Sequence, residues 1–324
     1  MKNFKRFACA MLSVAMIASA FAGCKGKNRT AVIGINQYGE HASLDNCREG
    51  FISGLKKAGL KEGVDFELDY QNAGFDDAAA TQISQSFASK DVDMMCAIAT
   101  PSAVACYAAA EEKDIPVIFT AVNDPEKAKV NTGNITGTSD KLPVEGQLKL
   151  IRAMQPTAKT IGIIYTTSES NSVSTIAEYE KLAANYNFKI ESIGVTAQAE
   201  VTQAVDTLIK KKVDCFSNLT DNNVVGVLQA ILEKTNDAKI PVYGSEVEQV
   251  VKGCVAGAGI DYVKLGEQTG EMAAKVLKGE KKASEMDYEV ISEYGTYVNS
   301  AACKALNVTV PDNVKSTATE TAKN

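Results

Sequence analysis

Hydroxyl, amide and carboxylate side chains recur where short apolar runs of this sequence end, and few lysines or arginines accompany them. Backbone N–H groups and hydroxyls suit a carboxylate, whereas Asp or Glu suits an ammonium. The pattern therefore favours a zwitterion or an amine over phosphate, sulfate or nucleotides, which need nearby cations. These loops cover residues 36–41, 99–103, 123–124, 165–172, 219–223 and 244–246.

The loop Ala99-Thr100-Pro101-Ser102-Ala103 has the features of a helix start. Pro101 suits a first helical turn, and Thr100 or Ser102 could cap it. Free N–H groups at a helix N-terminus could seat a small anion such as a carboxylate. Taken alone, this loop is better explained as a plain cap, and each loop carboxylate has the alternative of a solvated turn residue.

Catalytic chemistry has little support in the sequence. Glu169, Asp221, Glu246 and Asp261 could pair as acid and base, as in glycoside hydrolysis, but nothing fixes their separation. Nucleophile-elbow, phosphate-loop and Cys–His signatures are absent, and the single histidine, His41, excludes poly-histidine metal sites. We expect a protein that is not an enzyme and that needs no cofactor or metal. His41 is most simply a polar loop residue, with a ligand-lining role as the alternative.

The composition is that of a globular protein: 324 residues, 45% hydrophobic and 23% charged. The net charge is −6, and leaving out Lys2, Lys5 and Arg6 at the N-terminus gives 31 basic against 40 acidic residues, or −9. This charge disfavours nucleic acid and anionic lipid as partners.

The N-terminus has the features of an export signal. Three basic residues precede an apolar run over 7–21, which is short for a membrane span. We expect a signal peptide over 1–23. Ala20-Phe21-Ala22-Gly23-Cys24 resembles a bacterial lipobox, although Phe21 stands where Leu is usual. The resemblance implies lipidation of Cys24, a tether over 24–29 and an extracytoplasmic protein anchored to the cell membrane; a signal peptide with an incidental cysteine is the alternative.

Six further cysteines are scattered singly and show no metal-binding spacing. Most stand among apolar neighbours, where a free cysteine behaves as a small core residue. We therefore expect unpaired packing thiols at Cys47, Cys96, Cys106, Cys215, Cys254 and Cys303.

Strand and helix patterns alternate with short connections from residue 31 onward. The expected strands are 31–35, 64–70, 92–99 and 115–122, and the expected helices are 44–58, 77–89 and 102–112. This alternation predicts a parallel α/β sheet.

The pattern then repeats. Ile33-Gly34-Ile35 recurs at 161–163, Val92-Asp93 at 213–214, and Ile115-Pro116-Val117 at 240–242, with offsets of 128, 121 and 125. Similar offsets in unchanged order predict two related lobes. Crossovers are expected at 135–140, 255–261 and 289–291. We assign 30–138 plus 255–283 to lobe 1 and 139–254 plus 284–312 to lobe 2, and expect a disordered tail over 313–324.

Several segments together resemble the ABC-transporter substrate-binding lipoproteins often assigned to tryptophan, tyrosine or related aromatic amino acids. The resemblance runs from about Val32 to Pro311 and rests on Asn72-Ala73, 99–103, 115–125, Gly137-Thr138-Ser139-Asp140, 168–172, Thr220-Asp221-Asn222 and Gly259-Ile260-Asp261-Tyr262. It implies the fold of type I periplasmic binding proteins, two doubly wound parallel-sheet lobes joined by three crossover strands.

The resemblance also implies a ligand between the lobes. Thr100, Ser102 and Ala103 would meet its carboxylate, Asp124, Ser139 and Asp140 would line the hinge side, and Glu169, Asn171, Ser172, Asp221 and Asn222 would close from lobe 2. Glu246, Asp261 and Tyr262 would lie nearby, as would Gln37 from the first loop. Tyr38 and Phe75 could stack on a ring or simply pack. Two departures, the lack of Pro after His41 and Glu246 in place of Asp, bear on ligand identity.

The implied protein is a monomer that binds an amino-acid-like solute by hinge closure and presents it to an ABC permease and its ATPase. The alternative is a sensor that uses the same module to report to a membrane signalling partner.

Overall fold

A computed structural model describes residues 29–291 and 293–322. The expected signal peptide over 1–23, the lipidated Cys24 and the tether except Arg29 lie outside these residues. The chain divides into two units, 1–30 and 31–324, and everything below concerns the second.

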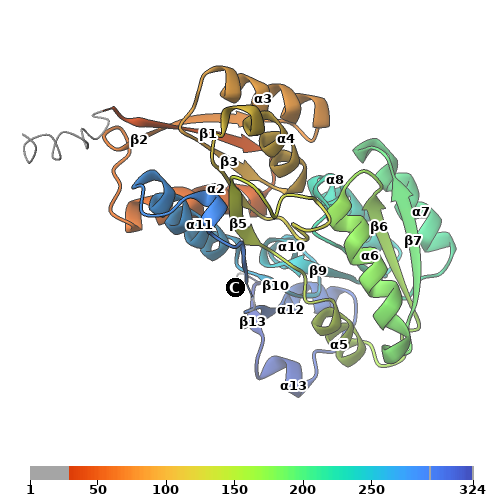
Figure 1. Cartoon of the computed structure of the whole chain (residues 1–324). Helices are drawn as coiled ribbons and strands as arrows, with labels where there is room; N and C mark the ends of the chain where they lie inside the picture. The colour runs from red at the N-terminus through yellow and green to blue at the C-terminus, as the bar shows by residue number, and fades with distance from the viewer. Residues whose placement is uncertain (1–28, 292, 323–324) are drawn as a thin grey trace, which may run out of the picture. The chain divides into compact units, whose positions relative to one another are not determined.

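Lobe 1 is built on a six-stranded parallel sheet of order β11-β5-β4-β3-β1-β2 (Figure 1). Its strands are β1 (Ala31–Gln37), β2 (Phe66–Asn72), β3 (Met94–Ile98), β4 (Val117–Thr120), β5 (Ile135–Ser139) and β11 (Glu289–Val290). Its helices are α2 (Ala42–Lys57), α3 (Asp77–Ser89), α4 (Thr100–Ala110) and α11 (Tyr262–Leu277).

Lobe 2 is built on a seven-stranded sheet of order β13-β12-β10-β9-β8-β6-β7, in which only the β10–β12 pair is antiparallel. Its strands are β6 (Thr160–Thr166), β7 (Lys189–Val195), β8 (Cys215–Ser217), β9 (Val242–Glu246), β10 (Ala256–Ile260), β12 (Gly295–Val298) and β13 (Thr319–Glu320). Its helices are α5 (Val144–Met154), α6 (Ser170–Ala183), α7 (Val201–Lys210), α8 (Asn222–Gly226), α9 (Leu228–Asp237), α10 (Val247–Lys252), α12 (Ser300–Ala305) and α13 (Asp312–Lys315).

Each sheet is buried on both faces, which explains why its central strands are continuous apolar runs. In lobe 1, Ile35 packs with Phe51 of α2 on one face, and Met95 packs with Phe87 of α3 on the other. Lobe 2 also has two cores, one on each face of its sheet. All six cysteines expected to pack in the interior are buried, and none forms a disulfide within the described residues.

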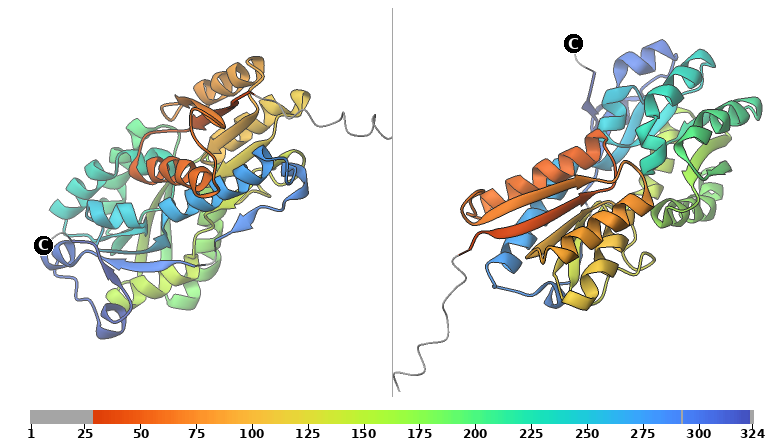
Figure 2. Two further views of the ribbon diagram at one scale, coloured as in Figure 1. Left: turned by 90° about the vertical axis from the view of Figure 1, so that its left-hand side faces the viewer. Right: turned by 90° about the horizontal axis from the view of Figure 1, so that it is seen from above.

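The chain passes between the sheets three times: after β5, after β10 and after β11. The predicted fold, two doubly wound lobes of the type I periplasmic-binding-protein plan joined by three crossovers, is therefore confirmed. Figure 2 shows the two sheets from two further directions.

The lobe boundaries differ from the prediction in two places. Residues 256–260 form β10, which pairs with β9 and β12 and so belongs to lobe 2, not lobe 1. Residues 289–290 form β11, which pairs with β5 and so belongs to lobe 1, not lobe 2. In both cases the strand finishes one sheet before the chain crosses to the other.

The tail predicted to be disordered over 313–324 is ordered as far as residue 322. Asp312–Lys315 form α13, and Thr319–Glu320 form β13, which pairs in parallel with β12. Val314 is buried in the core of lobe 2, and this apolar anchor was masked by its polar neighbours.

Helices α2 and α11 lie side by side in all views (Figures 1 and 2) and contact each other through glycines. A Cβ atom placed on Gly50 or Gly54 of α2 would lie 2.2 or 2.1 Å from a backbone oxygen of α11. A Cβ atom on Gly266 or Gly270 of α11 would lie 2.2 Å from a backbone oxygen of α2. The two backbones therefore touch directly.

Candidate functional site

The N-terminus of α2, in lobe 1, contacts lobe 2. Ser43 Oγ donates to Glu246 Oε2 over 2.5 Å, and Asn46 Nδ2 donates to Glu248 Oε1 over 2.5 Å. His41 Nε2 lies 3.5 Å from Asn222 Oδ1. Because α2 follows β1 and Glu246 ends β9, the carboxyl ends of strands from both lobes face each other here, where ligands of such sheets bind.

Glu169 is the centre of a buried network on the lobe 2 side. Its carboxylate accepts hydrogen bonds from Asn222 N and Nδ2, at 3.1 and 2.7 Å, and from Asn171 Nδ2 at 3.1 Å. Asn223 adds its N and Nδ2, both at 3.3 Å. Burial, together with the nearby charge of Asp221, raises the pKa of Glu169 to about 8. The network brings together three residues predicted for the ligand site, Glu169, Asn171 and Asn222.

Asp221 joins three segments of lobe 2. Its carboxylate accepts hydrogen bonds from Thr166 N at 2.6 Å, Thr166 Oγ1 at 2.8 Å and Ser172 Oγ at 2.7 Å. It also caps α8 by accepting from Val224 N at 3.1 Å. Burial raises its pKa. Asp221 and Ser172, both predicted to meet the ligand, thus hydrogen bond to each other and fix the shape of the loops.

Asp140 lies at the first crossover and is buried. One carboxylate oxygen accepts a hydrogen bond from Tyr262 OH over 2.6 Å, and the other, Oδ1, has no partner within the described residues. Burial raises the pKa of Asp140 to about 6. The preceding residue, Ser139, donates through Oγ to Asn123 O at 3.0 Å, which fixes the crossover.

Buried polar atoms without a hydrogen-bond partner mark where this region could bind a ligand. Besides Asp140 Oδ1 they include His41 Nδ1, at the N-cap of α2, and Asn171 Oδ1, in the first turn of α6. Burial lowers the pKa of His41 to about 4, so its ring is neutral near pH 7. A buried polar atom costs free energy unless it is paired, so these three atoms favour a polar guest.

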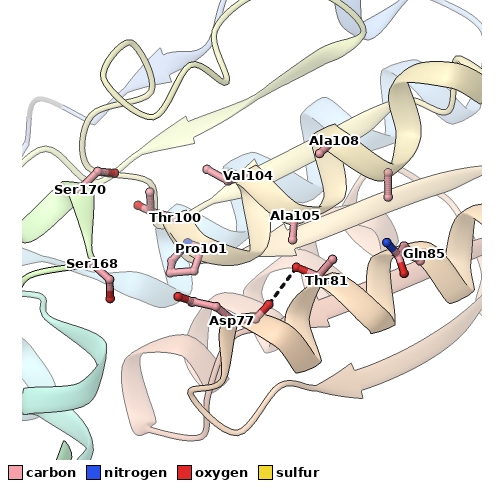
Figure 3. A pocket seen from close by; sticks show the side chains of 11 residues that line it. Asp77, Thr81, Gln85, Thr100, Pro101, Val104, Ala105, Ala108, Ser168 and Ser170 are labelled. Atoms are coloured by element: carbon pink, nitrogen blue, oxygen red, sulfur yellow. Dashed lines mark hydrogen bonds between the residues drawn. The ribbon is translucent and has the colours of Figure 1, made fainter. Parts of the chain in front are cut away.

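A cavity of about 390 Å³ lies where α4 begins (Figure 3). Thr100 and Pro101 line it from lobe 1, and Ser168 and Ser170 line it from lobe 2. The predicted residue Thr100 therefore lies at a surface shared by both lobes.

Two other predicted residues of α4 point inward. Ser102 Oγ donates to Asn36 Oδ1 at 3.1 Å, and Ala103 belongs to the core of lobe 1. Both side chains are engaged within lobe 1. Their role toward a ligand stays a prediction.

Three further predicted residues lie apart from these networks. Gln37 donates to Gly39 O and Asp45 Oδ1 and so holds the loop after β1. Asp261 caps α11 and is 41% exposed in its side chain, on another cavity of about 500 Å³. Asp124 accepts from Ser174 Oγ of α6 at 2.7 Å, which makes it a contact between the lobes.

The aromatic residues considered as ring partners contact one another. Phe75 lies parallel to His41 at a centroid distance of 6.3 Å, and Tyr38 meets Phe75 edge-on at 6.1 Å. Tyr38 OH also donates to Asp77 Oδ1 at 2.8 Å. In this arrangement both rings pack against residues of the same lobe, and stacking on a ligand ring stays a prediction.

Three residues of the lobe contact were not predicted from the sequence, namely Ser43, Asn46 and Glu248. Each lies two to five residues beyond a predicted site loop, in the first two turns of α2 or at the start of α10. The expectation that helix N-termini face the cleft was the signal that could have found them.

Two lobes of mostly parallel sheet, with strand ends and polar loops facing each other, are the architecture of type I periplasmic binding proteins. Residues 32–322 match the family described as ABC transporter substrate binding protein, and the chain belongs to this family. It is a substrate-binding protein of an ABC importer and not an enzyme.

Three similar proteins carry names or titles that bear on function. A "Tyrosine-binding protein" of Clostridioides difficile (strain R20291) is 38% identical over 87% of this chain and 83% of the relative. A Streptococcus pneumonia structure in complex with L-Trp is 30% identical and covers 90% of this chain and 99% of its own, with a TM-score of 0.86. The ligand-free, open structure of a substrate binding protein with adhesive properties from Clostridium difficile is 37% identical. It covers 90% of this chain and 100% of its own, with a TM-score of 0.67.

Two findings concern membranes and metals. In the part of the chain that the structure describes, no helix is both long and apolar enough to cross a bilayer. Over the same residues, no three His, Cys, Asp or Glu side chains are grouped so that they could hold a metal ion.

Proposed function

We propose that this protein binds an aromatic amino acid, L-tyrosine or a close analogue, between its lobes and delivers it to an ABC permease and its ATPase. Three unpartnered buried atoms carry the proposal, namely His41 Nδ1, Asp140 Oδ1 and Asn171 Oδ1. They supply acceptors for an ammonium and, with the N–H groups at the start of α4, donors and acceptors for a zwitterion. The names of the tyrosine-binding relative and of the L-Trp complex agree with this ligand class.

We assign roles within the site as follows. Thr100, with Ser102 and Ala103 behind it, forms the carboxylate end at the N-terminus of α4. Asp140 and Glu246 line the hinge side, with Ser139 and Asp124 beside them. From lobe 2, the Glu169 network of Asn171, Asn222, Ser172 and Asp221 closes over the ligand, whereas Gln37 and Asp261 act from the periphery.

The lobe contacts described above belong, we infer, to the closed conformation. The chain matches the L-Trp complex with a TM-score of 0.86 but the ligand-free, open structure with only 0.67, although the open protein is the more similar in sequence. Ligand stabilises such a state only through contacts that the open state lacks.

The proposed protein is a monomer that is exported by a signal peptide over 1–23 and anchored to the membrane by lipid on Cys24. Export agrees with the extracytoplasmic location of substrate-binding proteins of ABC importers. Mass spectrometry of the membrane-extracted protein tests the anchor: a diacylglyceryl mass on a chain that begins at Cys24 is expected, and an unmodified Cys24 would refute it.

L-Tyrosine is expected to raise the melting temperature of the protein. A ligand at 100 times its Kd stabilises the folded state by about 2.7 kcal/mol, which is about 5–10 °C for a protein of this size. Thermal shift and isothermal titration calorimetry measure the effect, with L-alanine and myo-inositol as controls. If neither L-tyrosine nor L-tryptophan raises the melting temperature or binds in calorimetry, the proposed ligand class is ruled out.

Ser174→Ala is expected to weaken ligand binding about threefold without lowering the stability of the free protein. Ser174 Oγ of α6 donates to Asp124 Oδ2 and accepts from Lys127 Nζ at 2.9 Å, so it links the two lobes. A part-exposed hydrogen bond of this kind contributes about 0.5–1 kcal/mol. Calorimetric titration with L-tyrosine tests it against Ser316→Ala, whose hydroxyl bonds to Asn313 O far from the lobe contact. Equal affinities for both variants would contradict the role of Ser174.

A further inference from the structure

Three carboxylates meet where the N-terminus of α2 contacts lobe 2. Glu246 and Asp140 are buried, with 2% and 3% of their surface exposed, and Glu248 is half-buried. Among the described residues, no lysine or arginine forms an ion pair with any of the three. Charges buried without a partner of opposite sign are costly, so this cluster must be neutralised in another way.

Two hydrogen-bond donors to the glutamates come from the opposite lobe, whereas Gln249 bonds to Glu246 from the same lobe. Ser43 Oγ donates to Glu246 at 2.5 Å and lies 3.3 Å from Glu248 Oε2, and Asn46 Nδ2 donates to Glu248. Separation of the lobes would remove both donors and let water reach the carboxylates. The cost of holding these groups ionised is therefore specific to the closed conformation.

We propose that closure of the lobes over a solute is coupled to proton uptake by the Glu246–Glu248 pair, so that the protein holds its solute more tightly at acidic than at alkaline pH. This proposal rests on the proposed function, because it concerns the regulation of the same interlobe site. The solute's single ammonium can neutralise one carboxylate of the cluster, which leaves a proton to neutralise another.

The direction of the effect follows from the titration of Glu246. Burial, followed by the like charge of Glu248, raises its pKa to about 8 in the closed protein. A hydrated glutamate titrates at about 4.5. Between pH 4.5 and pH 8, Glu246 holds a proton in the closed form but not in the open form. The stabilisation of the closed form over the open form is therefore complete below about pH 4.5 and is lost as the pH rises through 8.

The other groups that face the pair do not offset this charge. Glu248 and Asp140 carry the same sign, and burial raises the pKa of Cys47, Tyr262 and Cys254, which are neutral across the window. His41 also stays neutral, because burial lowers its pKa to about 4. Among the charged groups on the packed elements, Asp45 pairs with Arg48, Asp261 lies 4.0 Å from Lys264, and α10 carries Lys252.

Calorimetry with L-tyrosine between pH 5.5 and 8.5, in buffers of differing ionisation enthalpy, tests the coupling. The wild type should take up between half a proton and one proton at pH 7, and its Kd should rise between threefold and tenfold per pH unit. Glu246→Gln should take up clearly less of a proton and show a shallower rise of Kd with pH, and the remainder belongs to Glu169 and Asp140, whose pKa values burial also raises. Glu49→Gln, which changes an exposed glutamate one turn along α2 from Asn46, should behave as the wild type.

Small-angle scattering of the ligand-free protein separates this proposal from the proposed ligand class. The radius of gyration should be smaller at pH 5.5 than at pH 8.5 in the wild type and in Glu49→Gln, and the difference should be clearly smaller in Glu246→Gln. If the scattering changes in this way but neither L-tyrosine nor L-tryptophan binds, the coupling stands and the ligand class fails. Circular dichroism checks that each variant folds. If Glu246→Gln does not fold, Glu248→Gln replaces it and is expected to show reduced proton uptake. The coupling would be overturned if the radius of gyration and the Kd of the wild type did not change with pH. It would also be overturned if Glu246→Gln and Glu248→Gln both kept the pH dependence of the wild type.

Discussion

Asp221→Ala is expected to destabilise the folded protein by about 3–5 kcal/mol and to remove measurable solute binding. The Asp221 carboxylate accepts four hydrogen bonds, from Thr166 N and Oγ1, Ser172 Oγ and Val224 N. Alanine would leave all four buried donors without a partner, and each unpaired donor costs about 1–3 kcal/mol before relaxation. The loops after β6 and β8 would lose their common anchor and, with it, the positions of Glu169 and Asn222.

Chemical denaturation followed by circular dichroism measures this loss, and Asp261→Ala is the matched control. Asp261 also caps a helix, since its carboxylate accepts from Val263 N and Lys264 N, but its side chain is 41% exposed. Loss of an exposed cap costs about 1 kcal/mol. If the two alanine variants are equally stable, the buried network of Asp221 contributes nothing beyond its cap, and the expectation is wrong.

The fold was accessible from the sequence because the two lobes repeat one local pattern. Apolar strands and amphipathic helices alternate twice with similar offsets, and each signal lies within about ten residues. The sheet that β10 and β11 each join could not be predicted in this way. Ala256-Gly257-Ala258-Gly259-Ile260 has the same character whichever sheet receives it, and its pairing with β9 and β12 depends on distant contacts.

Only the loops that form the candidate site could be predicted from the sequence. The rule that ligands bind beyond strand ends brought Glu169, Asn171 and Asn222 into one list, and the structure brings them into one network. The direction of each side chain was not accessible. Ser102 turns toward Asn36, which is 66 residues away, and the Ser43–Glu246 contact joins residues 203 apart. Such pairs have no local pattern.

Gly266→Ala is expected to lower the free energy of unfolding by about 2 kcal/mol, although alanine is the better helix former. The added Cβ atom would lie 2.2 Å from Cys47 O and 2.9 Å from Phe51 N, both backbone atoms of α2. A helix backbone cannot yield as a side chain can, so α2 and α11 must move apart and lose contacts along their length. Overpacking costs about 1–3 kcal/mol, which exceeds the gain of about 1 kcal/mol in helix propensity.

The matched control is Gly146→Ala in the first turn of α5. Its Cβ atom would meet the ring of Tyr294 at 3.1 Å, and that side chain is 51% exposed and able to move. We therefore expect Gly146→Ala to be neutral or to stabilise the protein by up to about 1 kcal/mol. Urea denaturation compares the two variants directly. Because α2 carries Ser43 and Asn46 and α11 carries Tyr262, the same displacement should also weaken solute binding in Gly266→Ala but not in Gly146→Ala. A Gly266→Ala protein as stable as the wild type would show that the two helices can separate freely, and the close backbone contact would then have no part in holding the α2 N-terminus against lobe 2.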